Sequence, residues 1–211
     1  MAIIFNGLGH QAGRQGNMFR NNIKYQTLKL NKGDFLFYQS ADVERLFLLE
    51  KGRIKLVRET VEGQSLVMHI AYSQETFAEA SFFSQVYHCH AICDSACTVF
   101  SFAKTEVAQY LQDSPNAMME LLKTYAQQVR SLRLLNEIKS INSAYERVLT
   151  FFASEVDENF ELHFSYSLKD MARRLGLAHE TFYRILKTLE QEGKIVRYAQ
   201  FIKMRPLHKY G

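Results

Sequence analysis

Residues 167–191 read SLKDMARRLGLAHETFYRILKTLEQ, and this stretch decides the fold of the C-terminal part of the chain. Ser167 is a favourable N-cap residue with the acidic Asp170 three positions later, and Gly176 suits the turn that ends a first helix. A second helix is expected over 178–190. Two short helices joined by a tight turn predict a helix-turn-helix. We expect its core to consist of Leu168, Met171, Ala172, Leu175, Leu177, Phe182, Ile185, Leu186 and Leu189.

The outward face of the second predicted helix is polar. The i, i+4 spacing places Glu180 and Arg184 on one side of the helix. A glutamate can accept a hydrogen bond from cytosine, and an arginine can donate two to guanine. This pattern predicts base readout by His179, Glu180 and Arg184, and phosphate contacts by Lys169, Thr181, Tyr183, Lys187 and Lys203. The alternative is a packing motif whose polar face is only solvated.

The charge distribution agrees with a polyanion-binding module. The net charge of the chain is +4, but residues 167–211 contain ten Lys or Arg and four Asp or Glu, a net +6. The preceding 166 residues contain 16 basic and 18 acidic side chains, a net −2. A basic C-terminal module on a slightly acidic body is typical of proteins that bind nucleic acid.

The N-terminal half shows a different period. Short alternating or apolar runs over 27–30, 35–38, 45–49, 53–58 and 65–71 are separated by turn residues, with later runs near 88–93 and 97–102. Such spacing predicts a β sandwich or barrel. Residues 1–20 are rich in Gly, Gln and Asn, and we expect them to form an arm that precedes the β domain.

A long helix is predicted from Pro115 onward. Apolar side chains recur at alternating steps of four and three residues and end at one polar residue, which is the spacing of a coiled-coil seam. We expect a dimer seam, although a helix packed on its own sheet is the alternative. The predicted seam consists of Met118, Leu122, Tyr125, Val129, Leu132 and Asn136.

Three segments together resemble the CRP/FNR family of bacterial transcription regulators. Residues 32–37 (KGDFLF) and 46–56 (LFLLEKGRIKL) are similar to the family's β roll, and residues 175–187 (LGLAHETFYRILK) to its recognition motif. Residues 192–195 and 201–203 resemble the wing, and residues 144–148 the first helix of the DNA-binding domain. In this resemblance, Glu180 and Arg184 match positions that read a G·C-containing half-site, and His179 matches a position that tunes half-site choice.

The resemblance implies an α+β fold. It comprises an N-terminal cyclic-nucleotide-binding-type β roll (jelly roll), a long dimerisation helix and a C-terminal winged helix-turn-helix. The expected divisions are 1–112 for the β-roll sensor with its arm, 113–140 for the helix and 141–211 for the DNA-binding domain. The implied function is sequence-specific transcription regulation by a homodimer on pseudo-palindromic double-stranded DNA. RNA polymerase is the further partner that an activator would need.

The predicted effector pocket departs from the pattern of cyclic-AMP-binding members. It contains Glu79, Ser81, Tyr87 and His88, with Tyr87 and His88 at the positions where those members bear Arg and Ser. Neither side chain offers the guanidinium fork that suits a phosphate, and Glu75 would repel one. We therefore expect a small-molecule or redox signal other than cyclic AMP. A regulator that needs no effector is the alternative.

No cofactor is required by the sequence. Residues 88–97 contain Cys89, Cys93 and Cys97 with His88 and His90, a set that suggests metal or haem. On one strand, however, the cysteines and histidines would occupy opposite faces, so we assign no metal site. We also predict no catalytic residues. The alternative of a cupin-like metalloenzyme is not favoured, because this sequence lacks the second metal-ligand group of that family. The zinc-protease pattern that begins at His179 has Tyr183 in place of its second histidine.

The sequence predicts a cytoplasmic protein with no membrane association. No apolar run approaches the length of a membrane span, and the first apolar residues are not preceded by a basic segment. The odd count of three cysteines is typical of a reducing compartment rather than of a disulfide scaffold.

Overall fold

The computed structural model describes residues 18–164 and 166–205. They divide into two compact units, one that ends at Thr124 and one that begins at Tyr125, and each unit is described by itself. The arm predicted over residues 1–20 lies outside the described residues apart from its last three, which belong to a helical turn at 18–22. The predicted three-part division at 112/113 and 140/141 stays a prediction.

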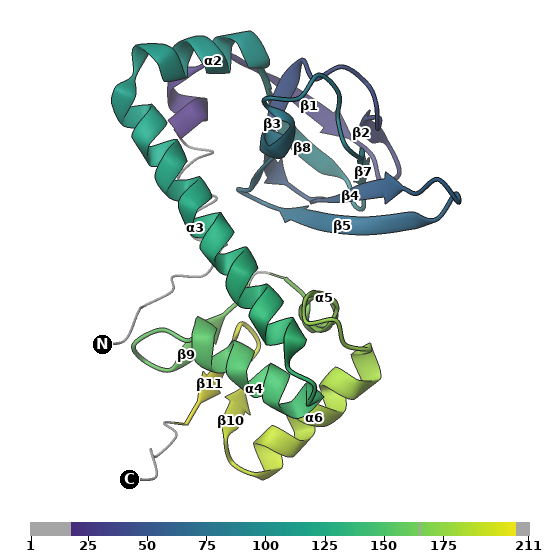
Figure 1. Ribbon diagram of the computed structural model, residues 1–211, viewed down its shortest axis with the longest axis vertical. Helices are drawn as coiled ribbons and strands as arrows, with labels where there is room; N and C mark the ends of the chain where they lie inside the picture. Colours follow the sequence, from purple (N-terminus) through teal and green to yellow (C-terminus); the bar gives the residue numbers. More distant parts are fainter. Residues whose placement is uncertain (1–17, 165, 206–211) are drawn as a thin grey trace. The chain divides into compact units, whose positions relative to one another are not determined.

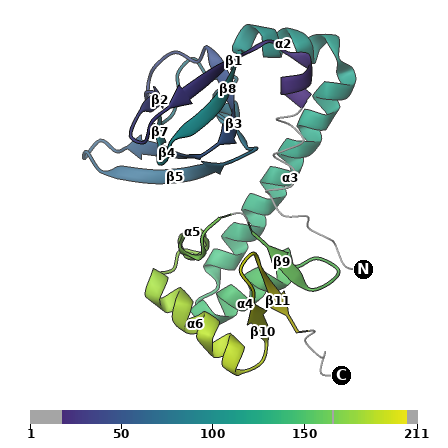
Figure 2. The same cartoon turned by 180° about the vertical axis from the view of Figure 1, so that it is seen from behind.

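The N-terminal unit is a roll of two four-stranded antiparallel sheets (Figure 1). The strand orders are β1-β8-β3-β6 and β2-β7-β4-β5, and the view from behind shows the same two layers (Figure 2). The predicted β architecture is therefore confirmed, with the short strand β6 as an addition. The strands are β1 (Tyr25–Leu30), β2 (Phe35–Phe37), β3 (Arg45–Lys51), β4 (Arg53–Glu59), β5 (Ser65–Tyr72), β6 (Thr76–Phe77), β7 (His90–Cys93) and β8 (Cys97–Ala103).

Glycine is required at the tight connection between β3 and β4. Gly52 has φ +103°, a left-handed conformation that side chains rarely adopt. A Cβ at this position would lie 2.5 Å from the carbonyl oxygen of Ala96 and 2.7 Å from Sγ of Cys97. The turn therefore tolerates only glycine, both for its dihedral angle and for the close approach of the strand β8.

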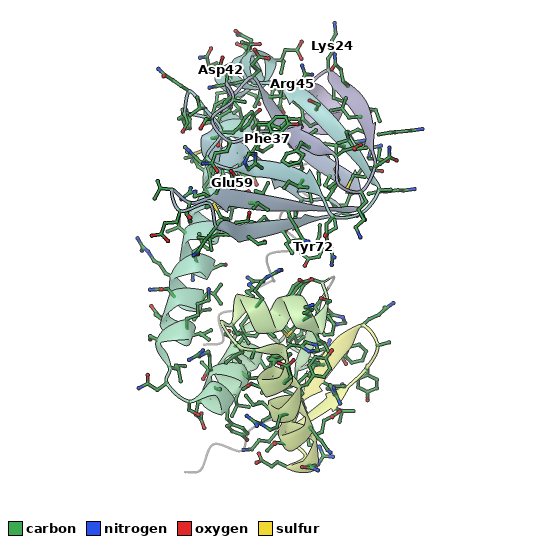
Figure 3. All side chains as sticks on the ribbon, turned by 90° about the vertical axis from the view of Figure 1, so that its right-hand side faces the viewer. Lys24, Phe37, Asp42, Arg45, Glu59 and Tyr72 are labelled. Atoms are coloured by element: carbon green, nitrogen blue, oxygen red, sulfur yellow. The ribbon has the colours of Figure 1, made fainter. Side chains whose placement is uncertain are left out.

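Aromatic rings fill the interior of the roll. The ring of Phe37 stacks on that of Tyr87, with centroids 3.9 Å apart, and on that of Phe47 at 5.5 Å. Phe47 in turn stacks on Phe77 at 5.5 Å. Figure 3 shows Phe37 between the strands of the roll. These four rings form an aromatic column that joins the two sheets, and they bury a large apolar area.

Two helices follow the roll. The first is α2 (Lys104–Asp113), which buries Val107 and Leu111. A short 3₁₀ helix, η1 (Glu79–Ser81), lies within the roll, between β6 and β7. The sequence prediction missed α2 because ten residues with so few apolar positions give a weak period. Helix α3 (Pro115–Ser140) begins at the predicted proline. No helix in the described part of the chain is long and apolar enough to cross a membrane.

The C-terminal unit is a winged helix-turn-helix. Its elements are α4 (Ala144–Glu155), β9 (Glu161–His163), α5 (Leu168–Arg174), α6 (His179–Gln191), β10 (Ile195–Arg197) and β11 (Phe201–Met204). The strands form one antiparallel sheet in the order β10-β11-β9 (Figure 1). All nine residues predicted for the core lie in one apolar cluster, with Leu168 and Leu177 only partly buried. This part of the fold prediction is confirmed.

The predicted caps of α5 are present. The backbone N–H of Asp170 donates to Oγ of Ser167 at 3.1 Å, and the Ser167 hydroxyl donates to the Asp170 carboxylate at 2.7 Å. At the other end, Gly176 has φ +66°, and the N–H of Leu177 donates to the carbonyl of Ala172 at 2.9 Å. The bonds at Ser167 fix the start of α5. The turn at Gly176 and the bond from Leu177 end α5 and set the direction in which α6 begins.

Candidate nucleic-acid interface

Helix α6 separates its apolar and polar residues cleanly. Phe182, Ile185, Leu186 and Leu189 are buried in the core of the unit. The opposite face exposes His179, Glu180, Tyr183, Arg184 and Lys187. The structure therefore brings the predicted base-reading residues together on one solvent-facing surface, within two turns of the helix N-terminus. We call the surface formed by these five residues the α6 outer face.

Three members of the α6 outer face retain their charge for a partner. Among the described residues, Glu180, Arg184 and Lys187 have no intramolecular ion-pair partner. Lys169, at the start of α5, is likewise exposed and has none. A guanidinium or ammonium group without an internal counter-charge can bind a phosphate or a base edge without first breaking an ion pair.

Lys203, predicted to contact phosphate, is placed differently. Its Nζ lies 2.9 Å from Oε1 of Glu161 on the neighbouring strand β9. The hydrogen bond to Glu161 raises the pKa of Lys203 above its ordinary value. Its charge is therefore balanced within the protein, which weakens the case for a phosphate contact. Thr181, another predicted phosphate contact, is half-buried.

A row of side chains connects α6 with the wing. The rings of His179 and Tyr183 lie 4.4 Å apart between centroids, at an interplanar angle of 51°. Arg197 of β10 makes an ion pair with Glu190 of α6, with Nη2 and Oε2 2.6 Å apart. The hydrogen bond to Glu190 is the main cause that raises the pKa of Arg197, and the Tyr183 phenol contributes electrostatically.

Arg147 holds the turn of the helix-turn-helix, a role that the sequence prediction missed. Its Nε and Nη2 donate to the carbonyl of Ile141 at 3.0 and 2.7 Å. Its Nη1 donates to the carbonyl of Leu175 at 3.2 Å. One guanidinium therefore provides hydrogen-bond donors for two carbonyls, that of Ile141 just after α3 and that of Leu175 at the end of α5. The only sequence signal was a basic residue in the first turn of α4, which does not reveal partners 28 positions away.

A second missed group anchors the beginning of the wing. Lys194 Nζ donates to Oη of Tyr145 at 2.7 Å and lies 3.0 Å from the carboxylate of Glu192. The Tyr145 hydroxyl donates to the same carboxylate. The hydrogen bonds to Tyr145 and Glu192 raise the pKa of Lys194. Like Lys203, Lys194 is therefore engaged within the protein.

The residues of the predicted effector pocket face different surroundings. Tyr87 is buried in the aromatic column, where its hydroxyl donates to the carbonyl of Arg45 at 2.7 Å. Ser81 is buried in η1, whereas His88 is exposed and its Nε2 lies 3.1 Å from Oγ of Ser84. Tyr87 thus has a structural role in the core, which counts against its prediction as a ligand contact.

Glu79 is in an environment that disfavours an anionic ligand. Burial raises its pKa, with a further rise from the nearby Glu75 and an opposing effect of His69. A cyclic nucleotide presents a phosphate, which needs a cation or free N–H donors. Of the two side chains that act electrostatically on Glu79, Glu75 is an acid and His69 is the one potential cation, so these residues are a poor fit to a cyclic nucleotide bound through its phosphate.

The cysteines are free and belong mainly to the core. Cys93 and Cys97 are buried and Cys89 is half-buried. Burial raises the pKa of Cys93 to about 12, together with its neighbour Cys97. His90 faces away from this core, with its ring 5.6 Å from that of Phe35. On β7, His90 and Cys93 therefore lie on opposite faces, whereas His88 and Cys89 precede this strand and Cys97 belongs to β8.

One group of possible metal ligands lies at the edge of the wing sheet. Within the described residues, Asp157, Glu161 and His163 form the one such group, with ligand atoms within 4.8 Å of one another. Lys203 already balances the charge of Glu161. We assign no ion to this group.

The predicted seam residues lie along α3. Met118, Leu122, Val129 and Leu132 are exposed in the single chain, Leu122 by 53% and Leu132 by 64%. Tyr125 is half-buried and Asn136 is exposed. Near the end of the helix, Ile138 is buried in the core of the C-terminal unit. No element among the described residues covers this stripe of exposed apolar residues on α3.

Comparison with known proteins agrees with this architecture. Residues 27–114 match the family model of the cyclic nucleotide-binding domain. The anaerobic regulatory protein of Bacillus subtilis (strain 168) is 22% identical over 176 residues, which cover 79% of this chain and 74% of that protein. The transcriptional activator protein anr of Pseudomonas aeruginosa is 21% identical over 173 residues, which cover 79% and 71%.

A solved structure extends the likeness to both units. The structure of FixK2 from Bradyrhizobium japonicum matches with a TM-score of 0.63 at 16% identity, covering 87% of this chain and 93% of that one. At this identity, the match establishes the fold. Taken together, the matched domain, the two related regulators and the shared fold show that this chain is similar to transcription regulators of the CRP/FNR type.

Proposed function

We propose that the protein is a sequence-specific DNA-binding transcription regulator. The observation that carries the proposal is the α6 outer face on the second helix of a helix-turn-helix, where Glu180 and Arg184 lie exposed and have no ion pair with any described residue. In such a motif, the second helix enters the major groove. Glu180 would accept from a cytosine amino group, and Arg184 would donate to O6 and N7 of guanine.

The proposed active form is a homodimer. The heptad spacing and exposure of Met118, Leu122, Val129 and Leu132 support a seam against a second copy of α3. A two-fold dimer would place two α6 helices in successive major grooves, about 34 Å apart. The binding site is therefore expected to be a pseudo-palindrome with half-sites one helical turn apart.

The test is a selection from random duplex DNA with the purified full-length protein and no added effector. We expect a two-fold symmetric site with a G·C pair in each half. Arg184→Ala should relax the preference at that pair and cost about 1–3 kcal/mol of binding free energy. Lys187→Ala is the matched control because it should weaken binding to all sequences alike. Selection of no sequence by a folded dimer, with or without added candidate effectors, would refute the proposal.

The proposed signal is a small molecule or a redox change other than cyclic AMP. The burial of the Glu79 carboxyl, with a further electrostatic effect of Glu75, supports the exclusion of cyclic AMP. The aromatic column of Phe37, Tyr87, Phe47 and Phe77 favours a second candidate, a regulator of the same fold that needs no effector. Such a regulator would be controlled by its abundance.

The same DNA selection separates these two candidates. Protein that has been unfolded, dialysed and refolded carries no small molecule from the cell. If this protein selects the same site with the same affinity, no effector is required. If binding returns only with a cell extract from which macromolecules have been removed, a small molecule is required. We propose no enzymatic activity, a cytoplasmic location, and RNA polymerase as a partner if the regulator activates.

A further inference from the structure

The ring of Tyr183 contacts two other rings of α6, one on the α6 outer face and one in the core. Its ring lies 4.4 Å from the ring of His179, the first residue of α6. Its other ring neighbour is Phe182, at 6.3 Å and nearly perpendicular. Although 38% of Tyr183 is exposed, its ring is therefore held by contacts within α6.

The pKa of Arg197 on β10 is raised mainly by its hydrogen bond to Glu190, with a smaller electrostatic contribution from the Tyr183 phenol. Arg197 is in turn held by its ion pair with Glu190 at 2.6 Å. The ring of Tyr183 therefore has a neighbour, His179, in the free protein, which favours a positioning role over the predicted phosphate contact.

We infer that Tyr183 is a positioning residue that orients His179 toward a base edge in the major groove. This inference rests on the proposed function and names the chemistry that His179 recognises. An imidazole N–H is a donor, and the acceptor it meets in the major groove is N7 of a purine, with O6 in addition when the purine is guanine. The target is therefore a purine at one position of each half-site.

The physical reason is preorganisation. An exposed histidine with no neighbour samples several rotamers and loses that freedom on binding. The ring of Tyr183 restricts the imidazole before DNA arrives, so less side-chain entropy is lost when the hydrogen bond forms. The adjacent Glu180 and Arg184 carry no such ring contact among the described residues, so the effect is specific to His179.

The inference differs measurably from a phosphate contact of Tyr183. Loss of a phosphate contact weakens binding to all sequences alike. Loss of a positioning contact removes the preference at the one base pair that His179 reads, and leaves the preferences due to Glu180 and Arg184 unchanged. The readout is therefore the preference at each position of the half-site, rather than affinity alone.

The experiment compares wild-type protein with His179→Ala, Tyr183→Ala, Tyr183→Phe and the double variant His179→Ala/Tyr183→Ala. Each binds a library of duplexes in which every position of the selected half-site is varied in turn. We expect both single alanine variants to lose discrimination at the same base pair, by about fivefold or more. The double variant should lose no more than either single variant, because the two residues act as one unit. Tyr183→Phe keeps the ring and should retain most of the preference.

Several outcomes would overturn the inference. A uniform loss of affinity in Tyr183→Ala, equal to that of the control Lys187→Ala, would make Tyr183 a phosphate contact. An unchanged preference in Tyr183→Ala, or additive losses in the double variant, would show that His179 acts without it. Thermal unfolding of each variant identifies a folding defect, in which case Tyr183→Leu replaces Tyr183→Ala.

Failure of the proposed function has a different signature. If wild-type protein selects no site in any condition, both the proposed DNA-binding function and the inference about Tyr183 are refuted. If it selects a site whose preferences depend on Arg184 but not on His179, only the inference falls.

Discussion

At the scale of single residues, the charge that a side chain presents depends on its neighbours more than on its type. Lys187 and Lys203 are both exposed lysines of the basic C-terminal unit, but within the part of the chain that the structure describes only Lys203 has an acidic partner, Glu161, at 2.9 Å. Half-buried Glu79 is an opposite case, in which an acid lies in surroundings that disfavour its charge. These differences lead to two predictions.

The first prediction concerns the salt dependence of DNA binding. A lysine that neutralises one phosphate contributes about 0.9 to the slope of log K against log salt concentration. We expect Lys187→Ala to reduce the slope by about 1, and Lys203→Ala to change it by clearly less, because Glu161 already balances Lys203. Fluorescence anisotropy of a labelled duplex over a range of salt concentrations measures both. Glu161→Gln should free Lys203 and steepen the slope, and an equal effect of the two lysine variants would refute the distinction.

The second prediction concerns Glu79 and pH. Its folded-state pKa is raised by burial above the ordinary value of 4.5, so the folded state holds this proton more tightly than the unfolded state. The stability associated with Glu79 is therefore present below pH 4.5 and is lost as the pH rises through the folded-state pKa. Glu79→Gln should raise the melting temperature at pH 7.5 and change it little near pH 4. The exposed Glu62→Gln is the control and should show no such pH-dependent difference.

At the scale of the elements, the helix-turn-helix depends on interactions from outside the motif. The caps at Ser167 and Gly176 determine where α5 begins and ends. The guanidinium of Arg147 on α4 then binds the carbonyl of Leu175 in the turn and that of Ile141 after α3. The orientation of α6 therefore depends on α4 as well as on the turn.

The third prediction tests this dependence. Arg147→Met keeps most of the apolar stem but leaves the carbonyls of Ile141 and Leu175 without their charged donor. Because hydrogen bonds to charged groups contribute about 1.5–3 kcal/mol, we expect a loss of about that size in the free energy of unfolding. Urea denaturation measures it. Arg133→Met, at an exposed position of α3, is the matched control, and equal stability of the two variants would argue against the role of Arg147.

At the scale of the whole molecule, the exposed apolar stripe on α3 has to be covered if the protein is to act as proposed. Leu122 and Leu132 are both more than half exposed, and they lie at positions of one heptad pattern. A second copy of the helix would bury them with knobs-into-holes packing.

The fourth prediction is that a charge in this stripe separates the dimer. Leu132→Glu should give a monomer in sedimentation velocity at concentrations where wild-type protein is dimeric, because an unpaired carboxylate in the seam is costly to desolvate. Its affinity for a two-half-site duplex should fall as well. Gln127→Glu introduces the same group on another side of α3 and should remain a dimer. A dimeric Leu132→Glu variant would place the interface elsewhere.

The sequence by itself determined the features that depend on neighbours within one or two turns of the chain. Period and cap residues located the strands of the roll, the start of α3, both helices of the helix-turn-helix and all nine of its predicted core residues. The polar residues of α6 were found in the same way, since the buried side of an amphipathic helix defines the exposed one. The short helix α2 was not predicted, because its ten residues contain too few apolar positions to show a helical period.

Only the tertiary structure decided which of these side chains are available. Lys203 contacts Glu161 from 42 positions away, Arg147 contacts Leu175 from 28 positions away, and Tyr87 lies in the core against Phe37. Such contacts arise when separate elements pack, and their energy depends on distances that no local pattern encodes. For this reason, residue type identified the candidate interface, whereas packing decided which of its charges remain for a partner.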